Sequence, residues 1–344
     1  MSAVVTGAGA AFPPLQQAQA ELFETYFRAH AGRSARVAER VWRNTGIERR
    51  SGAVDPRVED VAQWGTAQRM ERYVTEAMPL GRDAIAKALA DAGLDAADVG
   101  LLTVVSCTGY STPGLDIRLA DELGMAADVQ RLFIGHMGCY AALPGLGAVS
   151  DFVAARGRPA VMLCLELTSL HVQPPTADLQ QIVAHSLFGD AAAAVVVQAD
   201  AATGWEVVDT AAVTDASTSA LMTWDVTDTG FRMGLSPKVP AVLQRHARPA
   251  VEALLDRHGL AVTDIAGWAV HPGSARIVEV IAEQLGLDRT AVQASFDVLA
   301  DRGNCSSATV LLVLARVQVD PGGYAVAMAF GPGLTLYSTL LRRR

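Results

Sequence analysis

The sequence predicts an α/β protein in which helices pack in layers against sheets and the chain forms two similar halves. Short apolar runs alternate with longer stretches of helical periodicity, which is the pattern of an α/β fold. Several of the apolar runs are continuous, as in strands covered on both faces. Ala92–Leu94 and His258–Leu260 each end a helical stretch with Gly-Leu shortly before an apolar run, although helix C-caps alone produce such a pattern. This weak repeat predicts one unit over residues 1–203 and a second over residues 204–344.

Each expected element follows from the periodicity of its apolar residues. Five short apolar runs predict strands, over Leu101–Ser106, Ala160–Leu165, Ala191–Val197, Ile265–Val270 and Tyr324–Phe330. Longer stretches with apolar residues at helical spacing predict helices over Met78–Ala92, Asp116–Leu123, Ala141–Ala155, Val242–His258, Ser274–Leu285 and Ser306–Val317. Because strands and helices alternate, the elements are expected to stack in α/β layers.

The composition excludes two function classes. The 344 residues are 51% hydrophobic and 19% charged, which argues against long disordered regions. The formal net charge is −8, whereas broad nucleic-acid binding needs a basic face. The closing Arg342–Arg344 is too short to change this and is interpreted as a solvated tail. We therefore expect a globular protein that does not bind nucleic acid.

Cysteine usage and the N-terminus indicate a cytoplasmic protein without a metal site. The four cysteines form no CxxC pair, which argues against structural zinc; they are Cys107, Cys139, Cys164 and Cys305. Met1–Gly7 lacks the basic and apolar regions of a signal peptide. No uncharged apolar run approaches the roughly 20 residues that a membrane-spanning helix requires.

Cys139 is the leading candidate for a nucleophile. Gly138 precedes it, and the small residues that follow, such as Ala141 and Ala142, predict the start of a helix. Exposed backbone N–H groups and the positive end of the helix dipole stabilise a thiolate at such a position. The alternative is a small buried hydrophobe, the usual role of a cysteine in an apolar chain.

His271 and Asn304 supply the other groups that a reacting thiolate needs. His271 ends an apolar run, and Pro272 and Gly273 force a turn after it, so the imidazole is expected to face a crevice. Asn304 lies at a second predicted helix start. The alternatives are a histidine that satisfies its own turn and a simple helix N-cap. Together the three residues can act as nucleophile, base and oxyanion donor.

Two glycine-rich segments have different interpretations. Phe330, Gly331, Pro332 and Gly333 form a turn after an apolar strand, where glycine lets the backbone approach a ligand closely; an ordinary hairpin is the alternative. Thr6–Gly9 begins like a dinucleotide-binding fingerprint, but Phe12 stands where glycine is needed and two prolines block the following helix. That interpretation is rejected.

An arginine cluster and one phenylalanine complete the candidate residues. Arg36, Arg40 and Arg43 fall on one helix face, where they can bind phosphates of a CoA-type ligand or simply be solvated. Phe188 follows a helical stretch and precedes a strand. Its ring either lines a cavity or fills the core.

The chain resembles the type III polyketide synthases, the chalcone synthase-like branch of the thiolase fold. The resemblance runs from Asn44 to the end, and its motifs are GCYAA at Cys139, LFGDAA at Phe188, VHPG at His271, GNCSSA at Asn304 and FGPGLT at Phe330. The chain resembles bacterial members, including mycobacterial alkylpyrone synthases, in stretches such as ELTSLHVQPP and AHSLFGDAAAA. The resemblance implies a thiolase-like αβαβα layered fold with two similar halves and a Cys139–His271–Asn304 catalytic triad. It also implies that Phe188 is the gatekeeper between a CoA tunnel and an inner cavity, with Phe330–Gly333 as the cyclisation loop.

Several positions depart from the plant enzymes and bear on the substrate. Met233 occupies the place of a second gatekeeper phenylalanine, and its flexible thioether suggests an adaptable cavity mouth. Cys107 replaces a cavity-lining threonine, and His171 and Trp224 are expected to shape the same cavity.

The expected CoA contacts and subunit interface differ as well. Only Arg40 matches a basic CoA-binding position, and Asn44 replaces a lysine, so Arg36 or Arg43 is expected to compensate. Thr112 stands where a methionine crosses the dimer interface of the family, and a homodimer is expected.

The resemblance implies that the enzyme condenses malonyl-CoA, with loss of CO₂, onto an acyl-CoA starter bound to Cys139. A fatty acyl-CoA starter and cyclisation to an alkylpyrone or alkylresorcinol are expected. No cofactor is expected beyond the CoA thioester substrates. One alternative is a ketoacyl synthase of fatty-acid initiation, whose motif His-Gln-Ala-Asn differs from His271-Pro-Gly-Ser. Others are a papain-like cysteine protease, whose Cys–His separation is similar, and a non-catalytic thiolase-fold protein.

Overall fold

The protein is built around one mixed sheet of nine strands. The computed structural model describes residues 1–344. The strand order is β11-β12-β13-β8-β1-β7-β6-β4-β5. The strands span Ala3–Ala11 (β1), Leu101–Ser106 (β4), Gln130–Gly135 (β5), Ala160–Glu166 (β6), Ala191–Ala199 (β7), Trp205–Thr214 (β8), Ile265–Val270 (β11), Tyr324–Gly331 (β12) and Thr335–Arg343 (β13).

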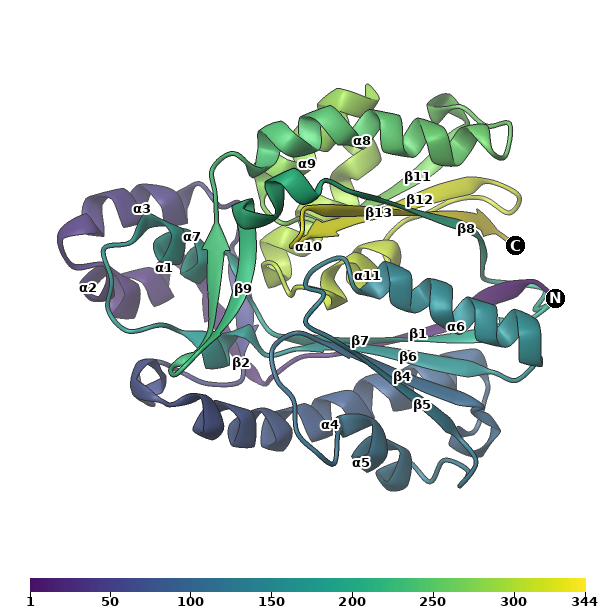
Figure 1. Ribbon diagram of the computed structural model, residues 1–344, viewed down its shortest axis with the longest axis horizontal. Helices are drawn as coiled ribbons and strands as arrows, with labels where there is room; N and C mark the ends of the chain where they lie inside the picture. Colours follow the sequence, from purple (N-terminus) through teal and green to yellow (C-terminus); the bar gives the residue numbers. More distant parts are fainter.

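Helices cover the outer faces of the sheet and also lie between its two halves, so that helices and strands form alternating layers (Figure 1). Helices α4 (Thr66–Ala92) and α5 (Leu115–Glu122) lie below β1, β7, β6, β4 and β5 in the view. Helices α6 (Ala142–Arg156) and α11 (Ala308–Leu314) lie between the two halves of the sheet, and α8 (Val239–Asp256) and α9 (Ala275–Leu285) cover the far side. The order of layers is αβαβα, which confirms the predicted fold class.

The two halves repeat one pattern of strand pairing. In the first, β4 and β6 are parallel and β6, β7 and β1 follow as antiparallel neighbours. In the second, β11 and β12 are parallel and β12, β13 and β8 follow in the same way. Pairing of β1 with β8 joins the halves. The division at residues 203 and 204, between β7 and β8, remains our proposal for the domain boundary.

The glycines near the N-terminus serve packing. Gly7 and Gly9 lie inside β1, and a Cβ on either would overlap backbone of α4, at the carbonyl oxygens of Ala88 and Ala84. These glycines therefore let a helix approach a strand closely. The close packing accounts for both glycines, so no phosphate-binding loop is needed to explain them. This agrees with the rejection of the dinucleotide-binding fingerprint.

A smaller group of elements covers one end of the layers, at the left of Figure 1. It contains two pairs of antiparallel strands, β2–β3, whose strands are far apart in sequence, and the hairpin β9–β10. The bounds are Leu15–Ala18 (β2), Arg49–Gly52 (β3), Met222–Thr227 (β9), Gly230–Leu235 (β10), Gln19–Leu22 (α1), Arg28–His30 (α2), Ala35–Arg43 (α3) and Leu179–Leu187 (α7). Helix α10 (Gln293–Arg302) lies nearer the centre of the view and contacts α9 and α11. The sequence indicated helices at α3 and before Phe188, at α7, but not the other short elements, and together they supply much of the cavity wall described below.

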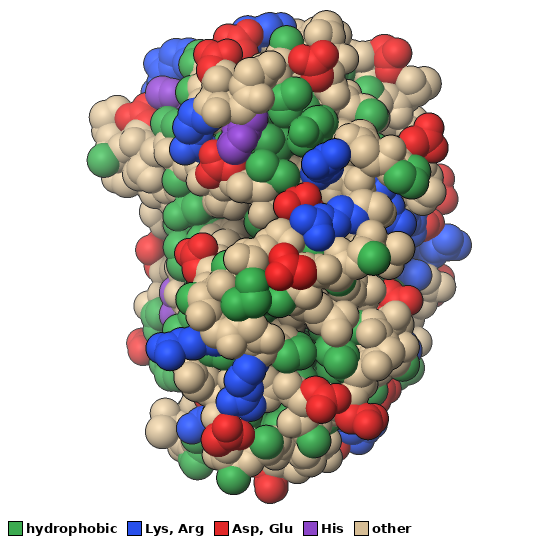
Figure 2. All heavy atoms as spheres, turned by 90° about the vertical axis from the view of Figure 1, so that its right-hand side faces the viewer, with side chains coloured by type: hydrophobic (Ala, Val, Ile, Leu, Met, Phe, Trp, Pro, Cys, Tyr) green, Lys and Arg blue, Asp and Glu red, His purple; other side chains and the backbone are tan.

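The side of the molecule drawn in Figure 2 carries charges of both signs. On the side drawn in Figure 2, Lys and Arg side chains alternate with Asp and Glu. None of the helices combines the length and the apolar character that crossing a bilayer requires.

Candidate active site

Cys139, His271 and Asn304 meet in one cavity, as the sequence predicts. Cys139 lies in the turn between β5 and α6, His271 directly follows β11, and Asn304 lies between α10 and α11. All three line a cavity of about 540 Å³. The two halves of the fold therefore both contribute to it, since Cys139 comes from the first and the other two residues come from the second.

Cys139 lies in surroundings that disfavour its thiolate. Burial raises the pKa of Cys139 to about 12, although Ser306 and Asn304 act in the opposite direction. The helix that follows begins at Ala142, three residues after Cys139. The glycine-rich turn packs closely here, because a Cβ on Gly331 would lie 3.3 Å from the backbone nitrogen of Cys139. That turn is both a β12–β13 hairpin and a wall of the site.

His271 is a buried imidazole without hydrogen bonds. Its exposed fraction is 0%, and neither ring nitrogen has a partner. Burial lowers the pKa of His271 to about 3, so the ring is neutral at pH 7. The ring packs edge-on against Phe330, with the ring centroids 5.6 Å apart. Because buried polar atoms are normally paired, both nitrogens are available to a molecule in the cavity.

Asn304 is oriented by its neighbours. Its Oδ1 accepts a hydrogen bond of 2.9 Å from the backbone N–H of Ser306, and its Nδ2 donates one of 3.3 Å to the carbonyl of Gly273. The amide has a second Nδ2 hydrogen, and hydrogen bonding from this side chain acts on the thiol of Cys139, whose pKa it lowers. The side chain is thus fixed in place with one donor beside Cys139.

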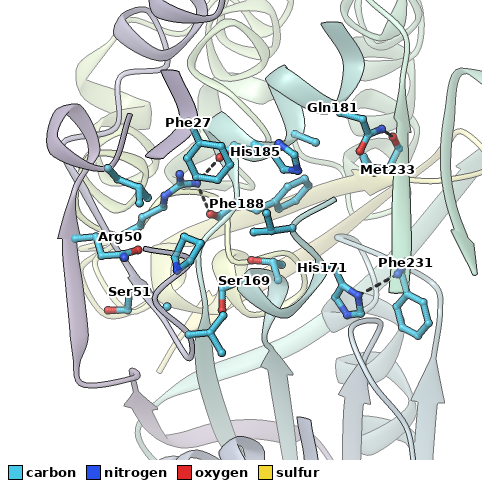
Figure 3. A pocket seen from close by; sticks show the side chains of 18 of the residues that line it. Phe27, Arg50, Ser51, Ser169, His171, Gln181, His185, Phe188, Phe231 and Met233 are labelled. Carbon is cyan, nitrogen blue, oxygen red and sulfur yellow. Dashed lines mark hydrogen bonds between the residues drawn. The ribbon is translucent and has the colours of Figure 1, made fainter. Parts of the chain in front are cut away.

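Phe188 and Met233 separate this cavity from two smaller ones. Both residues line all three. One inner cavity of about 60 Å³ includes His171 and Trp224 (Figure 3), and the other, of about 20 Å³, includes Cys107 and Trp224. The structure therefore brings all five predicted cavity residues to the expected region. Their individual roles stay predictions.

An aromatic stack closes the inner cavity on one side. Phe231 is fully buried and stacks on His171, with ring centroids 4.5 Å apart. The same ring stacks on Tyr110 at 6.2 Å, and Tyr110 is 48% exposed. This wall separates the cavity from the surface.

Sequence reasoning missed a buried carboxylate near Cys139. Glu166 ends β6 and is completely buried. It accepts hydrogen bonds from Ser307 (2.5 Å), Thr108 (2.8 Å) and the backbone N–H of Cys107 (3.0 Å). Burial raises its pKa. The only available signal was one glutamate at the end of a continuous apolar strand.

The predicted arginine cluster does not line the main cavity. Arg36, Arg40 and Arg43 are exposed on α3, and Arg43 forms an ion pair with Glu39. The cation that does line the cavity is Arg276, in the first turn of α9, which the sequence analysis did not single out. No cluster of three His, Cys, Asp or Glu side chains is arranged to bind a metal ion.

Comparisons with known proteins show the family and the fold of the chain. Family models described as chalcone and stilbene synthases match residues 1–201 with the N-terminal domain and residues 210–343 with the C-terminal domain. The chain is 35% identical to a 1,3,6,8-tetrahydroxynaphthalene synthase of Streptomyces peucetius subsp. caesius, across 96% of this chain and 91% of that protein. It is 34% identical to the alpha-pyrone synthesis polyketide synthase-like Pks18 of Mycobacterium tuberculosis, across 88% and 81%.

A solved structure gives the same result in three dimensions. The crystal structure of 1,3,6,8-tetrahydroxynaphthalene synthase from Streptomyces coelicolor A3(2), a bacterial type III polyketide synthase, matches with a TM-score of 0.93 and 29% identity over 99% of both chains. The thiolase-like layered fold predicted from the motifs is thereby confirmed. The chain belongs to the chalcone and stilbene synthase family and is a type III polyketide synthase, an acyltransferase-class condensing enzyme.

Proposed function

We propose that Cys139 carries the growing acyl chain as a thioester, with His271 and Asn304 as its catalytic partners. The observation that supports this most strongly is the convergence of the three residues on one cavity, with both ring nitrogens of His271 free of other partners. A thiol, a neutral imidazole and an amide hydrogen are the groups that acyl transfer and enolate formation require.

Loading begins with attack of Cys139 on an acyl-CoA thioester. As Sγ forms its bond to the carbonyl carbon, a ring nitrogen of His271 takes the thiol proton. The C–S bond to CoA then breaks, and the CoA thiolate takes the proton back from the imidazolium. Because burial disfavours both charged forms, the charges appear together and only while a substrate is bound.

Extension uses the same residues in a second role. Malonyl-CoA loses CO₂, and the electron pair of the broken C–C bond forms an enolate. An N–H of neutral His271 and the second Nδ2 hydrogen of Asn304 donate to the enolate oxygen. The enolate carbon attacks the Cys139 thioester, and Sγ leaves as a thiolate that takes up one proton from solvent water. The chain, now two carbons longer, lies on CoA, from which it reloads onto Cys139 for a further cycle or cyclises.

The substrates are an acyl-CoA starter and malonyl-CoA. The 540 Å³ cavity is of a size typical for small-molecule sites. Arg276 lines it and forms ion pairs with Glu279 and Glu283. We propose that a phosphate of CoA binds Arg276 in competition with these carboxylates, and that Arg36, Arg40 and Arg43 attract the more distant phosphates. No cofactor takes part in the proposed chemistry.

We propose that the acyl group of the starter is apolar, in line with the fatty acyl-CoA that the sequence analysis predicts. Phe188, Trp224 and Met233 provide an apolar wall on the inner side. The inner cavities of about 60 and 20 Å³ are smaller than the roughly 150 Å³ that holds one benzene ring. We therefore expect short members of the fatty acyl series to be preferred, unless the flexible Met233 moves aside.

A homodimer through the edge strand β5 is part of the proposal. β5 pairs only with β4, so its other edge is free. Leu132 and Phe133 on this strand are 39% and 36% exposed, and exposed apolar edge strands invite pairing. A second copy of the chain is the proposed occupant of this edge, and light scattering that shows a monomer would contradict the proposal.

A cytoplasmic location is also part of the proposal. The four cysteines are unpaired, which fits the reducing cytoplasm.

Product analysis across a panel of acyl-CoA starters tests the function. The purified enzyme is incubated with malonyl-CoA and acyl-CoAs from acetyl to palmitoyl, and products are identified by mass spectrometry. We expect lactone or resorcinol products lengthened by two-carbon units. Turnover of malonyl-acyl carrier protein but not of malonyl-CoA would instead support the ketoacyl synthase alternative.

A further inference from the structure

Arg50 is a buried cation that the proposed chemistry does not use. It lies in β3 with 5% of its surface exposed. Burial lowers the pKa of Arg50 to about 10, so the guanidinium is charged at neutral pH. The carboxylate of Asp190 is close enough to favour this charge, but it accepts its hydrogen bonds from Thr168 and Ser169. A buried charge without a bonded carboxylate is costly, so its contacts call for an explanation.

The guanidinium holds the end of helix α7 (Figure 3). Its Nη1 donates hydrogen bonds to the carbonyl oxygens of His185 (2.7 Å) and Phe188 (2.6 Å). It also lies over the ring of Trp42, 4.8 Å from the ring centroid. α7 ends at Leu187, and a cation at the negative end of a helix is favourable. Arg50 thus fixes the last turn of the helix together with the residue that follows it.

The segment held by Arg50 is bonded on both sides to Asn304. The backbone N–H of Asn304 donates to the carbonyl of Leu187 (2.9 Å), and the N–H of Gly189 donates to the carbonyl of Asn304 (3.0 Å). Phe188 and Asn304 thereby form a parallel bridge. A Cβ on Gly303 would lie 2.9 Å from the carbonyl oxygen of Leu187, and a Cβ on Gly189 would overlap backbone on the other side. The two segments are in direct backbone contact, so a shift of one moves the other.

We propose that Arg50 is a positioning residue for the condensation, because it fixes Leu187–Gly189 and so places the amide of Asn304 and the ring of Phe188 relative to Cys139. Phe188, Asn304 and Cys139 all line the main cavity. A displacement of about 1 Å at reacting groups costs on the order of 10²-fold in rate. The inference rests on the proposed role of Asn304.

Substitution of Arg50 tests the proposal through malonyl-CoA decarboxylation. Arg50→Met removes both carbonyl hydrogen bonds and keeps an apolar stem beside Trp42. We expect kcat to fall about 10- to 100-fold, while KM for malonyl-CoA changes little because the phosphate contacts lie elsewhere. Arg50→Lys retains the charge and a donor, and should recover part of the lost kcat.

A double-mutant cycle separates positioning from general destabilisation. If Arg50 acts through Asn304, Arg50→Met should have little further effect on decarboxylation in an Asn304→Ala background. Equal losses in both backgrounds would overturn the proposal, as would a wild-type kcat in Arg50→Met. Absence of malonyl-CoA decarboxylation and condensation in the wild-type protein would instead refute the proposed function itself.

Arg69 offers a matched control. It is also fully buried, donates to the carbonyls of Trp64 (2.9 Å) and Val172 (3.1 Å), and has a pKa lowered to about 10 by burial. It has no bond to the Asn304 segment, so Arg69→Met should destabilise the fold without lowering the decarboxylation kcat of the folded protein. If Arg50→Met fails to fold, Gly189→Ala displaces the same segment and should show the same coupling to Asn304→Ala. Additive losses in that cycle would contradict the proposal.

Discussion

At the scale of single residues, burial decides how Cys139 and His271 can react. Burial raises the pKa of Cys139 to about 12 and lowers the pKa of His271 to about 3. Neither group is charged on its own at pH 7, so proton transfer between them has to accompany attack on the thioester. Asn304 is fixed through its Oδ1 and keeps an N–H for the substrate. The three residues were identifiable from their sequence motifs, whereas their protonation states depend on burial that only the fold reveals.

Removal of the Asn304 amide tests the oxyanion role. Asn304→Ala should lower the rate of malonyl-CoA decarboxylation on the order of 10²–10³-fold, because one donor to the enolate oxygen is lost. The rate is followed as release of labelled CO₂. Thr290→Ala, at an exposed side chain that does not line the cavity, serves as a control with unchanged rate. A rate for Asn304→Ala close to that of the wild type would remove Asn304 from the site.

At the scale of elements, local patterns predicted five of the nine strands of the main sheet, β4, β6, β7, β11 and β12, and did not predict β1, β5, β8 and β13. All five predicted strands and all six helices occur near their expected positions. Helix α4 begins at Thr66, well before the expected Met78, and continues through Pro79. The sequence analysis omitted β1 because its run of Gly and Ala shows little apolar signal; its place in the sheet depends on contacts with α4 and β7 that are distant in sequence.

Gly9 in β1 should be intolerant of a side chain. Gly9→Ala places a Cβ against the carbonyl oxygen of Ala84 in α4, and overpacking of this kind costs about 1–3 kcal/mol of unfolding free energy. Urea unfolding measures the change. Gly147→Ala is the matched control, because its Cβ would meet nothing closer than 4.0 Å and alanine is the better helix former. Equal stability of the two variants would contradict the packing role of Gly9.

At the scale of the whole molecule, the site exists because two halves of the chain meet. The sequence predicted this division of labour, with Cys139 in one half and His271 and Asn304 in the other. It did not reveal Arg50, Glu166 or the cavity contact of Arg276. Each is one charged residue in a short or apolar segment, and its importance comes from partners that lie far away in sequence.

Buried histidines should make the stability of the whole fold depend on pH. Burial lowers the pKa of His171, His185 and His271 from 6.5 to about 3. Between these two pKa values the unfolded chain binds more protons than the folded protein. The contribution of the three histidines to the free energy of unfolding is therefore complete above about pH 6.5 and falls as the pH decreases. Each histidine adds about 1.4 kcal/mol per pH unit to this slope.

Substitution of one histidine measures its part of the slope. His171→Phe keeps a ring against Phe231 and should reduce the slope of unfolding free energy between about pH 6 and pH 4 by about 1.4 kcal/mol per unit. Urea titrations at a series of pH values provide the measurement. An unchanged slope would show that the imidazole of His171 titrates normally in the folded protein.

Acyl loading of Cys139 tests the central proposal most directly. The enzyme is mixed with an acyl-CoA in the absence of malonyl-CoA, digested, and analysed by mass spectrometry. We predict that the peptide containing Cys139 gains the mass of the acyl group, and that Cys139→Ala loads nothing while it still decarboxylates some malonyl-CoA. An acyl group found on another residue, or condensation by Cys139→Ala, would contradict the assignment of the nucleophile.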